Sequence, residues 1–259
     1  MSAADAPGTP GQVRIGCAGW SLSLSLSRAA QAAFGAGDSV LQRYATRLSM
    51  VEINSSFYRP HQAATYARWA ASVPAGFRFA VKLPRVISHE RRLRDTMQPL
   101  ALFLDGVMAL GDRLGPLLLQ LPPSLAYEPA TAAEFLHGLR ARTSVDVACE
   151  PRHPSWFTAD VDALLSDHGI ARVAADPARV PAAAVPGGDR TWSYWRWHGQ
   201  PQIYRSAYSE QALAGLARHL HREAAARRRA WCVLDNTALG HATGNALHLQ
   251  ALLQENANA

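Results

Sequence analysis

Eight short apolar segments recur along the chain, and helical patterns separate most of them. The segments are rich in branched and aromatic residues, which favours β-strands. Strands that alternate with helices predict parallel pairing, because each helical crossover returns the chain to the same edge. The predicted strands are Val13–Ala18, Met50–Asn54, Phe77–Leu83, Leu117–Leu121, Val145–Glu150, Ala171–Asp176, Trp192–His198 and Trp231–Asn236. The predicted helices are Val40–Leu48, Ala63–Ser72, Leu100–Leu114, Thr131–Arg142, Ala159–His168, Glu210–Arg229 and Gly240–Gln254.

These units predict an α/β fold, a single (β/α)8 TIM-type barrel, since right-handed crossovers close such units into a ring. The length of 259 residues is close to the ~250 typical of that fold. We expect an irregular sixth crossover, because Pro177–Arg190 contains three prolines and a Gly-Gly pair. A doubly wound open sheet is the alternative, but Gly16-Cys17-Ala18-Gly19-Trp20 is not the phosphate-binding turn that it needs.

The sequence predicts one domain over residues 13–255, which follows a disordered tail over residues 1–12. That tail lacks the basic start and the apolar stretch of a signal peptide. No apolar run approaches the ~20 residues of a membrane helix, so we expect no membrane partner. Cys17, Cys149 and Cys232 lie far apart in apolar runs without metal-binding spacing. We therefore predict reduced, buried thiols and a cytoplasmic location.

The basic balance of the chain favours anionic partners. The formal net charge is +6 and the isoelectric point is near 9.6, which suits phosphates or nucleic acid. Part of this charge is arginine on predicted helix surfaces, where it needs no partner. Lys82 is the only lysine of the chain, and every other formal side-chain cation is arginine. An amine differs from a guanidinium in shape, hydration and readiness to lose a proton, which singles this position out.

Polar residues gather where the predicted strands end. In a β/α barrel the carboxyl ends of the strands meet at one face, and that face carries the active site. A buried ion pair or a strand-capping amide explains any one of these residues, but seven polar strand ends at one face favour a functional site. The residues are Glu52, Asn54, Lys82, Gln120, Glu150, Arg152, His153, Asp176, Arg196, His198 and Asn236.

Several stretches together resemble the YecE-like domain-of-unknown-function family, number seventy-two in that series. The ordered set runs from about residue 13 to 253 and implies a β/α barrel without implying a reaction. The chain departs from the family pattern in the segment Leu22–Gly37, at Pro151, and at Asp235, where the family often has an asparagine. The matching stretches include Gly16-Cys17-Ala18-Gly19-Trp20-Ser21, Val51-Glu52-Ile53-Asn54-Ser55-Ser56-Phe57-Tyr58, Gln120-Leu121-Pro122-Pro123, Glu150-Pro151-Arg152-His153-Pro154-Ser155-Trp156, Tyr194-Trp195-Arg196-Trp197-His198-Gly199 and Asp235-Asn236-Thr237.

The residue types at the strand ends suit anion binding and proton transfer. Arginine can grip a carboxylate or phosphate with two hydrogen bonds, and histidine titrates near neutral pH. The start of the last helix, after Asn236, can add backbone N–H groups or serve only as a cap. We predict as catalytic Glu52, Lys82, Glu150, Asp176 and His198. We predict as substrate-binding Trp20, Asn54, Tyr58, Gln120, Arg152, His153, Arg196, Asn236 and Asn245.

Two alternatives for the chemistry stay open. Glu150, Asp176 and His198 are donors that suit a divalent metal, although the neighbouring arginines would repel one. We predict no metal and no cofactor, with a divalent metal as the alternative. Lys82 is expected to pair with Glu52 or with a ligand anion, and a Schiff-base role is the alternative.

These features predict an enzyme that acts on a small anionic or phosphorylated metabolite by acid–base chemistry. One alternative is a nucleic-acid-binding or DNA-repair barrel like endonuclease IV, which the basic charge favours and the lack of metal-ligand histidines opposes. A second is a non-catalytic ligand-binding barrel. The sequence leaves the substrate, the reaction and the oligomeric state open.

Overall fold

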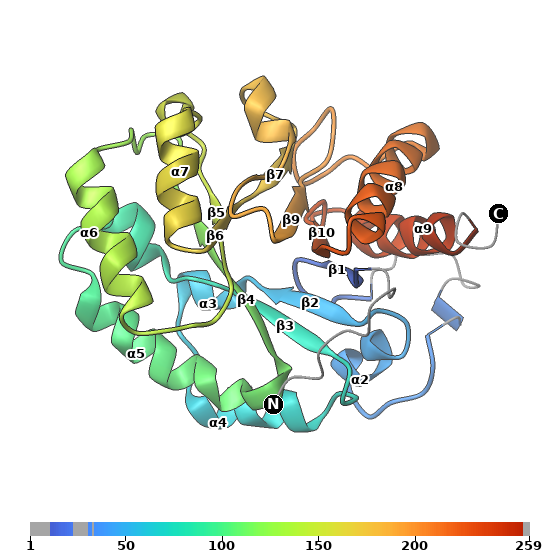
Figure 1. Cartoon of the computed structure of the whole chain (residues 1–259). Helices are drawn as coiled ribbons and strands as arrows, with labels where there is room; N and C mark the ends of the chain where they lie inside the picture. Colours follow the sequence, from blue (N-terminus) through green and yellow to red (C-terminus); the bar gives the residue numbers. More distant parts are fainter. Residues whose placement is uncertain (1–10, 23–30, 33, 256–259) are drawn as a thin grey trace.

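The computed structural model describes residues 11–22, 31–32 and 34–255. Its strands lie in the centre of the molecule and its helices lie around them (Figure 1). The predicted tail lies outside the described residues except at its end, where the Gly11 N–H donates to the Ala224 carbonyl. The divergent segment Leu22–Gly37 is also only partly described. In the described part of the chain, no helix is both long and apolar enough to span a membrane.

The strands form two sheets, and their pairing is parallel apart from one short edge strand. The first sheet has the order β1, β10, β9, β7, and the second has the order β2, β3, β4, β5, β6, β8. Among the strands that the structure describes, only β8 runs antiparallel, beside β6. The strands are β1 Val13–Cys17, β2 Met50–Ile53, β3 Arg78–Lys82, β4 Leu114–Gln120, β5 Val147–Glu150, β6 Ile170–Arg172, β7 Ala174–Asp176, β8 Gly187–Gly188, β9 Trp192–Trp197 and β10 Arg229–Leu234.

The two sheets approach each other at two places. A parallel bridge between Ala18 and Glu52 joins the end of β1 to β2, and the Gly19 N–H donates to the Glu52 carbonyl over 2.9 Å. Gly19 has a φ of +93°, which glycine adopts without strain. At the other place, only Val173 separates β6 from β7, which belong to different sheets. The segment predicted as one strand over Ala171–Asp176 is therefore shared between both sheets.

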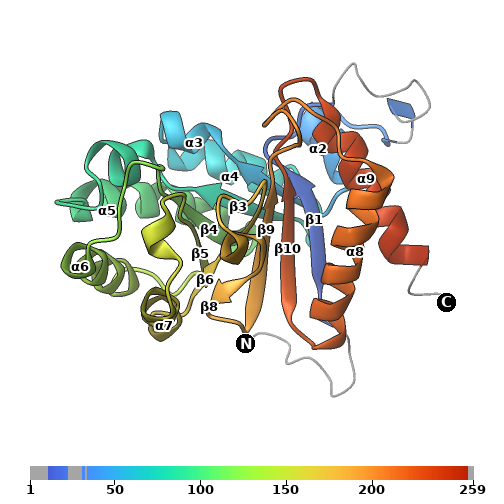
Figure 2. The same cartoon turned by 90° about the horizontal axis from the view of Figure 1, so that it is seen from above.

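The helices follow the predicted order, with ends that differ by a few residues. The helix predicted over Leu100–Leu114 divides into α5 and a short 3-10 helix, η2, in which Gly111 has a φ of +52°. Figure 2 shows α8 and α9 beside β10 and β1, on the side away from α6 and α7. The helices are α2 Val40–Ala45, α3 Ser55–Tyr58, α4 Ala63–Ala71, α5 Met97–Val107, α6 Pro129–Arg140, α7 Ala159–Asp167, α8 Glu210–Ala225 and α9 His241–Glu255, with short turns η1 Val86–Glu90, η2 Met108–Arg113, η3 Pro154–Trp156 and η4 Pro181–Ala184.

The sixth crossover is irregular, as its prolines and glycines predict. It contains only η4 and the two-residue strand β8. The Arg172 guanidinium ties this crossover to α7 through Asp162, at 2.7 Å, and donates to the Ala182 carbonyl. A Cβ atom at Gly187 would lie 2.3 Å from the Arg172 guanidinium, so this close approach requires glycine.

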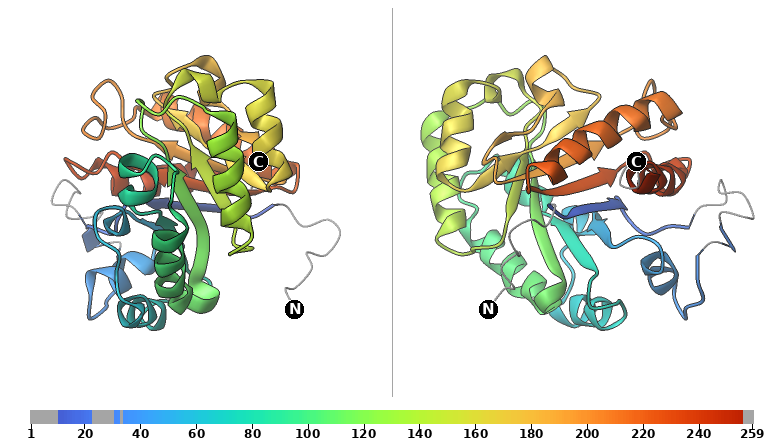
Figure 3. Two further views of the ribbon diagram at one scale, coloured as in Figure 1. Left: turned by 90° about the vertical axis from the view of Figure 1, so that its left-hand side faces the viewer. Right: turned by 45° about the vertical axis from the view of Figure 1, so that its right-hand side comes forward.

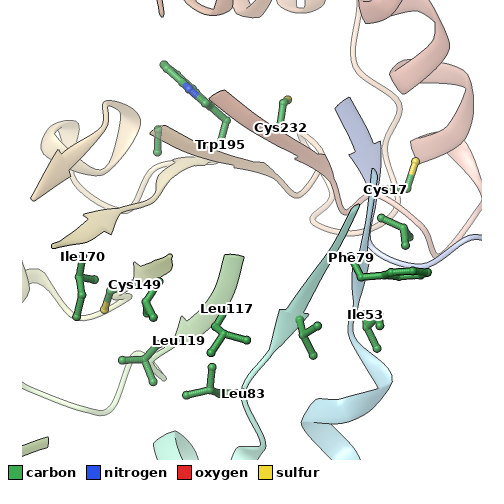
Figure 4. Packing of buried hydrophobic residues seen from close by; sticks show 14 of the residues in the cluster. Cys17, Ile53, Phe79, Leu83, Leu117, Leu119, Cys149, Ile170, Trp195 and Cys232 are labelled. Carbon is green, nitrogen blue, oxygen red and sulfur yellow. The ribbon is translucent and has the colours of Figure 1, made fainter. Parts of the chain in front are cut away.

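Apolar side chains fill the space on both faces of the strands. An outer cluster packs between strands and helices, and Figure 4 shows Trp195 and Cys232 on one sheet pointing away from Leu117 and Leu119 on the other. The two views of Figure 3 show helices along the outer sides of both sheets. An inner cluster covers the opposite face of the strands. Its members are Ala18, Met50, Ala80, Leu118, Ala148, Ala171, Val173, Trp192, Tyr194, Trp231 and Val233.

Candidate functional site

A layer of charged and polar residues covers the inner cluster where the strands end. Side chains on a strand alternate between its two faces, so the residue two positions after an inner apolar residue points the same way. Glu52 follows Met50 in this way, and Glu150 follows Ala148. The same spacing places Lys82, Gln120, Arg196 and Asp235 on the inner face. Each of these six residues is less than a tenth exposed.

Five of the buried residues form one connected group, which we call the ion cluster: Glu52, Glu150, Arg196, His198 and Asp235. Arg196 lies at its centre, and its guanidinium is 1% exposed. Its Nη2 atom lies 2.8 Å from Glu52 Oε1 and 2.9 Å from Asp235 Oδ2, and its Nη1 atom lies 3.1 Å from Glu150 Oε2. Burial alone would lower the pKa of Arg196, but the three carboxylates raise it well above its usual value.

The carboxylate of Glu52 forms its hydrogen bonds with other buried side chains of the protein. It is fully buried and accepts hydrogen bonds from the Arg196 guanidinium and, at 2.8 Å, from the Tyr194 hydroxyl. The predicted pairing of Glu52 with Lys82 is not among its contacts, because Arg196 and Tyr194 occupy both carboxylate oxygens.

His198 bridges two carboxylates. Its Nε2 atom lies 2.8 Å from Glu150 Oε1, and its Nδ1 atom lies 2.9 Å from Asp235 Oδ2. An imidazolium can donate to both oxygens at once, whereas a neutral imidazole can donate to only one. The Nε2 atom also lies 3.2 Å from Arg152 Nη2, so the ring joins the two carboxylates beside the guanidinium of Arg152.

The carboxylates of the ion cluster are stabilised in their charged form. Burial would raise the pKa of Glu150, but Arg152, Arg196 and His198 hold it well below its usual value. Burial likewise opposes ionisation of Asp235, while Arg196 and His198 lower the pKa of that carboxyl. Both groups thus contribute to stability above the ordinary pKa of a carboxyl and lose that contribution in acid.

Arg152 connects the ion cluster to a pocket. Its Nε and Nη2 atoms lie 3.2 and 3.0 Å from Glu150 Oε1, and its Nη1 atom lies 3.4 Å from the Tyr204 hydroxyl. The pocket has a volume of ≈ 210 Å³, and Arg179 lies exposed at it. Its polar wall is Glu150, Arg152 and His198, and its apolar wall is Pro151, Ala175, Pro177, Ala178, Ala183 and Ile203.

Tyr204 covers His198 beside this pocket. The two rings meet edge to face with centroids 5.6 Å apart, and the Tyr204 N–H donates to the His198 carbonyl. Tyr204 has a φ of +67°, a left-handed conformation that is strained for a residue with a side chain. These two contacts place the loop that follows β9 beside His198.

Lys82 stands apart from the ion pairs. It ends β3, is 8% exposed, and its Nζ atom lies 4.1 Å from the centroid of the Phe57 ring. Within the described ranges, its ammonium makes no ion pair or hydrogen bond. Burial and the nearby Arg196 lower the pKa of Lys82 to about 8, although Glu52, Glu150 and Asp235 counteract this.

Asp176, predicted as catalytic, lies outside the ion cluster. It pairs in register with Trp197, whose side chain packs against the outer cluster, so the Asp176 side chain turns away from the inner face. It accepts hydrogen bonds from the Tyr208 hydroxyl at 2.7 Å and from Gln200. Ala175 occupies the inner position that an inward-facing Asp176 would have needed. The prediction that Asp176 shares one site with Glu150 is therefore wrong, because Asp176 lies one position beyond the inward-facing residue of β7.

The two predicted asparagines of the last segment hold a loop. The Asn236 amide donates to the Ser206 carbonyl at 2.9 Å and to Asn245 Oδ1 at 2.8 Å. Asn245 Oδ1 also accepts the Tyr208 N–H at 3.1 Å. These contacts fix the loop over residues 199–208, so the structure gives both asparagines a positioning role.

The other predicted binding residues lie around the strand ends with different exposures. Trp20 packs edge to face on Trp69, and Tyr58 is 74% exposed. Asn54 follows β2 and has a buried Oδ1 atom without a hydrogen-bond partner in the described structure. Gln120 lies in register with Glu150 on the neighbouring strand. His153 caps η3, because its Nδ1 atom accepts the Ser155 N–H.

The sequence reasoning missed Tyr194, Tyr204 and Asp235 as members of the site. The sequence indicates Asp235 as a departure from the family pattern that adds a negative charge near the strand ends, but it was not predicted as a site residue. It lies two positions after Val233, an inner residue, so the alternation within β10 was the signal that could have found it. Tyr194 lies two positions after the inner residue Trp192 in β9, so the same alternation could have found it. No pattern in the sequence around Tyr204 indicates that it belongs to the site.

The described part of the chain contains no group of three or more His, Cys, Asp or Glu side chains arranged to hold a metal ion. Glu150 and His198, two of the predicted alternative ligands, lie together, but the third, Asp176, points elsewhere. Both oxygens of Glu150 and the Oδ2 atom of Asp235 lie within ion-pair distance of Arg152 or Arg196.

The fold and the ion cluster define a class of protein: mixed α/β proteins with parallel sheets and a buried charge network where the strands end. Within that class, the chain belongs to the family described as protein of unknown function DUF72, whose model matches residues 14–259. The resemblance seen in the sequence is thus confirmed.

Named relatives and solved structures agree with this assignment. The UPF0759 protein YecE of Escherichia coli K12 is 31% identical over 153 residues, which cover 57% of this chain and 56% of that protein. The chain thus spans about half the length of the curated relatives it matches. A DUF72 family protein of Enterococcus faecalis aligns with a TM-score of 0.77 at 21% identity, over 94% of this chain and 96% of the other. One from Thermotoga maritima aligns with a TM-score of 0.76 at 22% identity, over 94% and 99%. These structures support the fold alone.

Proposed function

We propose that the chain is an enzyme that acts on a small anionic metabolite by acid–base chemistry at the carboxyl ends of its strands. The observation that carries this proposal is the pocket of ≈ 210 Å³, because Glu150, Arg152 and His198 all line it. A guanidinium that can bind an anion and a carboxylate–imidazole pair that can move a proton therefore face the same small space.

The residues divide into two roles. Arg152 binds the anion, with its guanidinium oriented by Glu150 and with Arg179 adding charge at the pocket. His198 exchanges the proton, and Glu150 and Asp235 set its orientation. Arg196 and Glu52 were predicted to touch substrate, but at 1% and 0% exposure we assign them to holding the cluster in place. Their contribution is preorganisation of the groups that line the pocket.

We propose further that the two sheets act together as one TIM-type barrel over the domain at residues 13–255. The bridge between Ala18 and Glu52 and the single residue between β6 and β7 support this, since they place β1 beside β2 and bring β7 of one sheet directly after β6 of the other. The inner cluster would then be the barrel interior, and the ion cluster would lie at the carboxyl-terminal mouth, where barrel enzymes build their sites.

We also propose that the enzyme works in the cytoplasm. Cys17, Cys149 and Cys232 are free and buried, and burial raises the pKa of the Cys17 thiol to about 12. Free cysteines are typical of reducing compartments, which supports this location.

Anion binding can be tested by thermal melting with inorganic phosphate, glycerol 3-phosphate and malonate, with neutral glycerol as the comparison. A ligand at about 100 times its dissociation constant stabilises the fold by about 2.7 kcal/mol. For a chain of this size that corresponds to roughly 5–10 °C. We expect the anions to give this shift and glycerol to give none.

The matched variants are Arg152→Met and Arg229→Met, since each loses one ion-paired arginine. Arg229 pairs with Asp146 at the amino end of β10, away from the pocket. We expect the anion-dependent shift to disappear in Arg152→Met and to persist in Arg229→Met. Equal shifts in both variants, or no anion-dependent shift in the wild type, would refute the assigned anion site.

Proton transfer needs its own measurement. Proton NMR in D₂O can follow solvent deuterium entering the C–H bond next to a carbonyl in dihydroxyacetone phosphate and in 2-oxo acids. We expect catalysed exchange with the wild type, and its loss in His198→Asn while the anion-dependent melting shift remains. Anion binding without any exchange would leave a non-catalytic binding protein as the better description.

A further inference from the structure

The position of Lys82 sets it apart from every other cation of the site. It lies in register with Leu118 of the inner cluster, so its side chain enters the inner face. The Ser56 hydroxyl donates to the Lys82 carbonyl at 2.6 Å, which fixes the end of β3 against α3. The ammonium group is thus held at the ion cluster by a rigid strand end.

The carboxylates near Lys82 are already engaged. Glu52 accepts from Arg196 and Tyr194, and Asp235 accepts from Arg196 and His198. Within the described residues, the contact that Lys82 Nζ makes is with the ring of Phe57, whose centroid lies 4.1 Å away. A cation–π contact is weaker than a buried ion pair, so the environment does little to hold the proton on the amine.

The surroundings therefore favour a neutral amine. At pH 7.5, a pKa of about 8 leaves about a quarter of the Lys82 side chains uncharged, against about one in a thousand for an ordinary lysine. Only the neutral amine is a nucleophile. The charged or titratable groups that act on Lys82 or sense its charge are Arg196, Glu52, Glu150, Asp235 and His89.

We propose that Lys82 is a covalent catalytic residue that condenses with the carbonyl group of the substrate, so that the substrate is an anionic aldehyde or ketone. This proposal rests on the proposed function, since Arg152 supplies the binding site for the anionic end. The Lys82 nitrogen forms a bond to the carbonyl carbon and gives a carbinolamine. Loss of water then leaves an imine, and both amine hydrogens and the carbonyl oxygen depart in that water molecule.

The order of the strands limits the size of this substrate. Lys82 ends β3 and Arg152 follows β5, with β4 between them. Neighbouring strands lie about 4.8 Å apart, so these two strand ends are about 10 Å apart, and both side chains point inward. The length of a short carbonyl compound with one terminal phosphate or carboxylate matches this separation.

Reductive trapping tests the proposal on a favourable background, because Lys82 is the only lysine of the chain. Wild-type protein is incubated at pH 7.5 with glyoxylate, pyruvate or glyceraldehyde 3-phosphate, and with neutral propanal as the comparison. Borohydride then reduces any imine to a stable secondary amine. Peptide mass spectrometry separates a Lys82 adduct from an adduct at the amino terminus. We expect at least one anionic carbonyl to label Lys82 faster than propanal does.

A built-in reference comes from Arg218→Lys, which adds an ordinary amine on the exposed face of α8. We expect Lys82 to be trapped at least 10-fold faster than this second amine in the same molecule, with half-maximal rate near pH 8. Faster trapping of the exposed amine would overturn the proposal. So would the absence of a Lys82 adduct with all three anionic carbonyls.

The failure of this proposal is distinguishable from that of the proposed function. If Lys82 stays unlabelled while the melting shift with phosphate still depends on Arg152, the anion site stands and the covalent role is wrong. If neither the shift nor the adduct is observed, both proposals fail. In Lys82→Arg we expect the adduct on this peptide to be lost and the Arg152-dependent shift to be kept, and total labelling that stays at the wild-type level would contradict the assignment.

Discussion

Replacement of the central guanidinium, Arg196→Met, tests whether the ion cluster holds the strand ends together. Methionine fills similar space but leaves three buried carboxylates without their shared cation. Glu150 keeps Arg152 and His198, and Asp235 keeps His198, whereas Glu52 keeps only the Tyr194 hydroxyl. Removing one partner of a buried ion pair destabilises a protein by about 3–5 kcal/mol, because the other charge stays buried without compensation. Glu52, at 0% exposure, is the carboxylate for which this cost is most direct.

The loss should depend on pH in a defined direction. In the wild type the pKa values of Glu150 and Asp235 are lowered, so their contribution to stability is present above about pH 4 and is lost as pH falls through the folded-state values. Without Arg196, these carboxyls lose one of the cations that oppose the effect of burial, so their folded-state pKa values are higher than in the wild type and the stability that the variant loses diminishes as pH falls. The difference between the two proteins is therefore largest near pH 7.5 and shrinks toward pH 4.

Urea unfolding followed by tryptophan fluorescence at pH 7.5 and pH 4.5 measures this difference. We expect Arg196→Met to lose about 3–5 kcal/mol at pH 7.5, which corresponds to roughly 6–20 °C in melting temperature. The exposed Arg218→Met on α8 serves as the control and should change stability by less than about 0.5 kcal/mol. A loss below about 1 kcal/mol for Arg196→Met, or a loss that does not shrink in acid, would refute the reasoning.

Two further predictions concern the rest of the fold. The exposed Arg227 has a φ of +56° in the turn after α8, so Arg227→Gly should raise the free energy of unfolding by about 0.5–1 kcal/mol, and an unchanged or lower value in urea unfolding would count against this. Burial raises the pKa of the Cys17 thiol to about 12 and also raises those of Cys149 and Cys232. None of the three thiols should react with a thiol-specific disulfide reagent at pH 8 until urea unfolds the chain, and rapid labelling of the folded protein would contradict their burial.

The sequence by itself determined the order of strands and helices and the polar character of the strand ends. Local physics is enough for this, because an apolar run such as Leu117–Leu121 and an amphipathic pattern such as Ala159–His168 each favour one kind of element. It also indicated Glu150, Arg196 and His198 as members of one site, since parallel strands bring their carboxyl ends to one edge.

Only the tertiary structure decided which polar side chains meet. Asp176 and Asp235 both follow apolar strand segments, yet a phase difference of one residue turns the first outward and the second into the ion cluster. The cluster also decided that Arg196 serves three carboxylates and leaves Lys82 without an ion pair among the described residues. These contacts join residues up to 144 positions apart in the sequence. Which of them meet is decided by the packing of the whole fold and not by the local sequence.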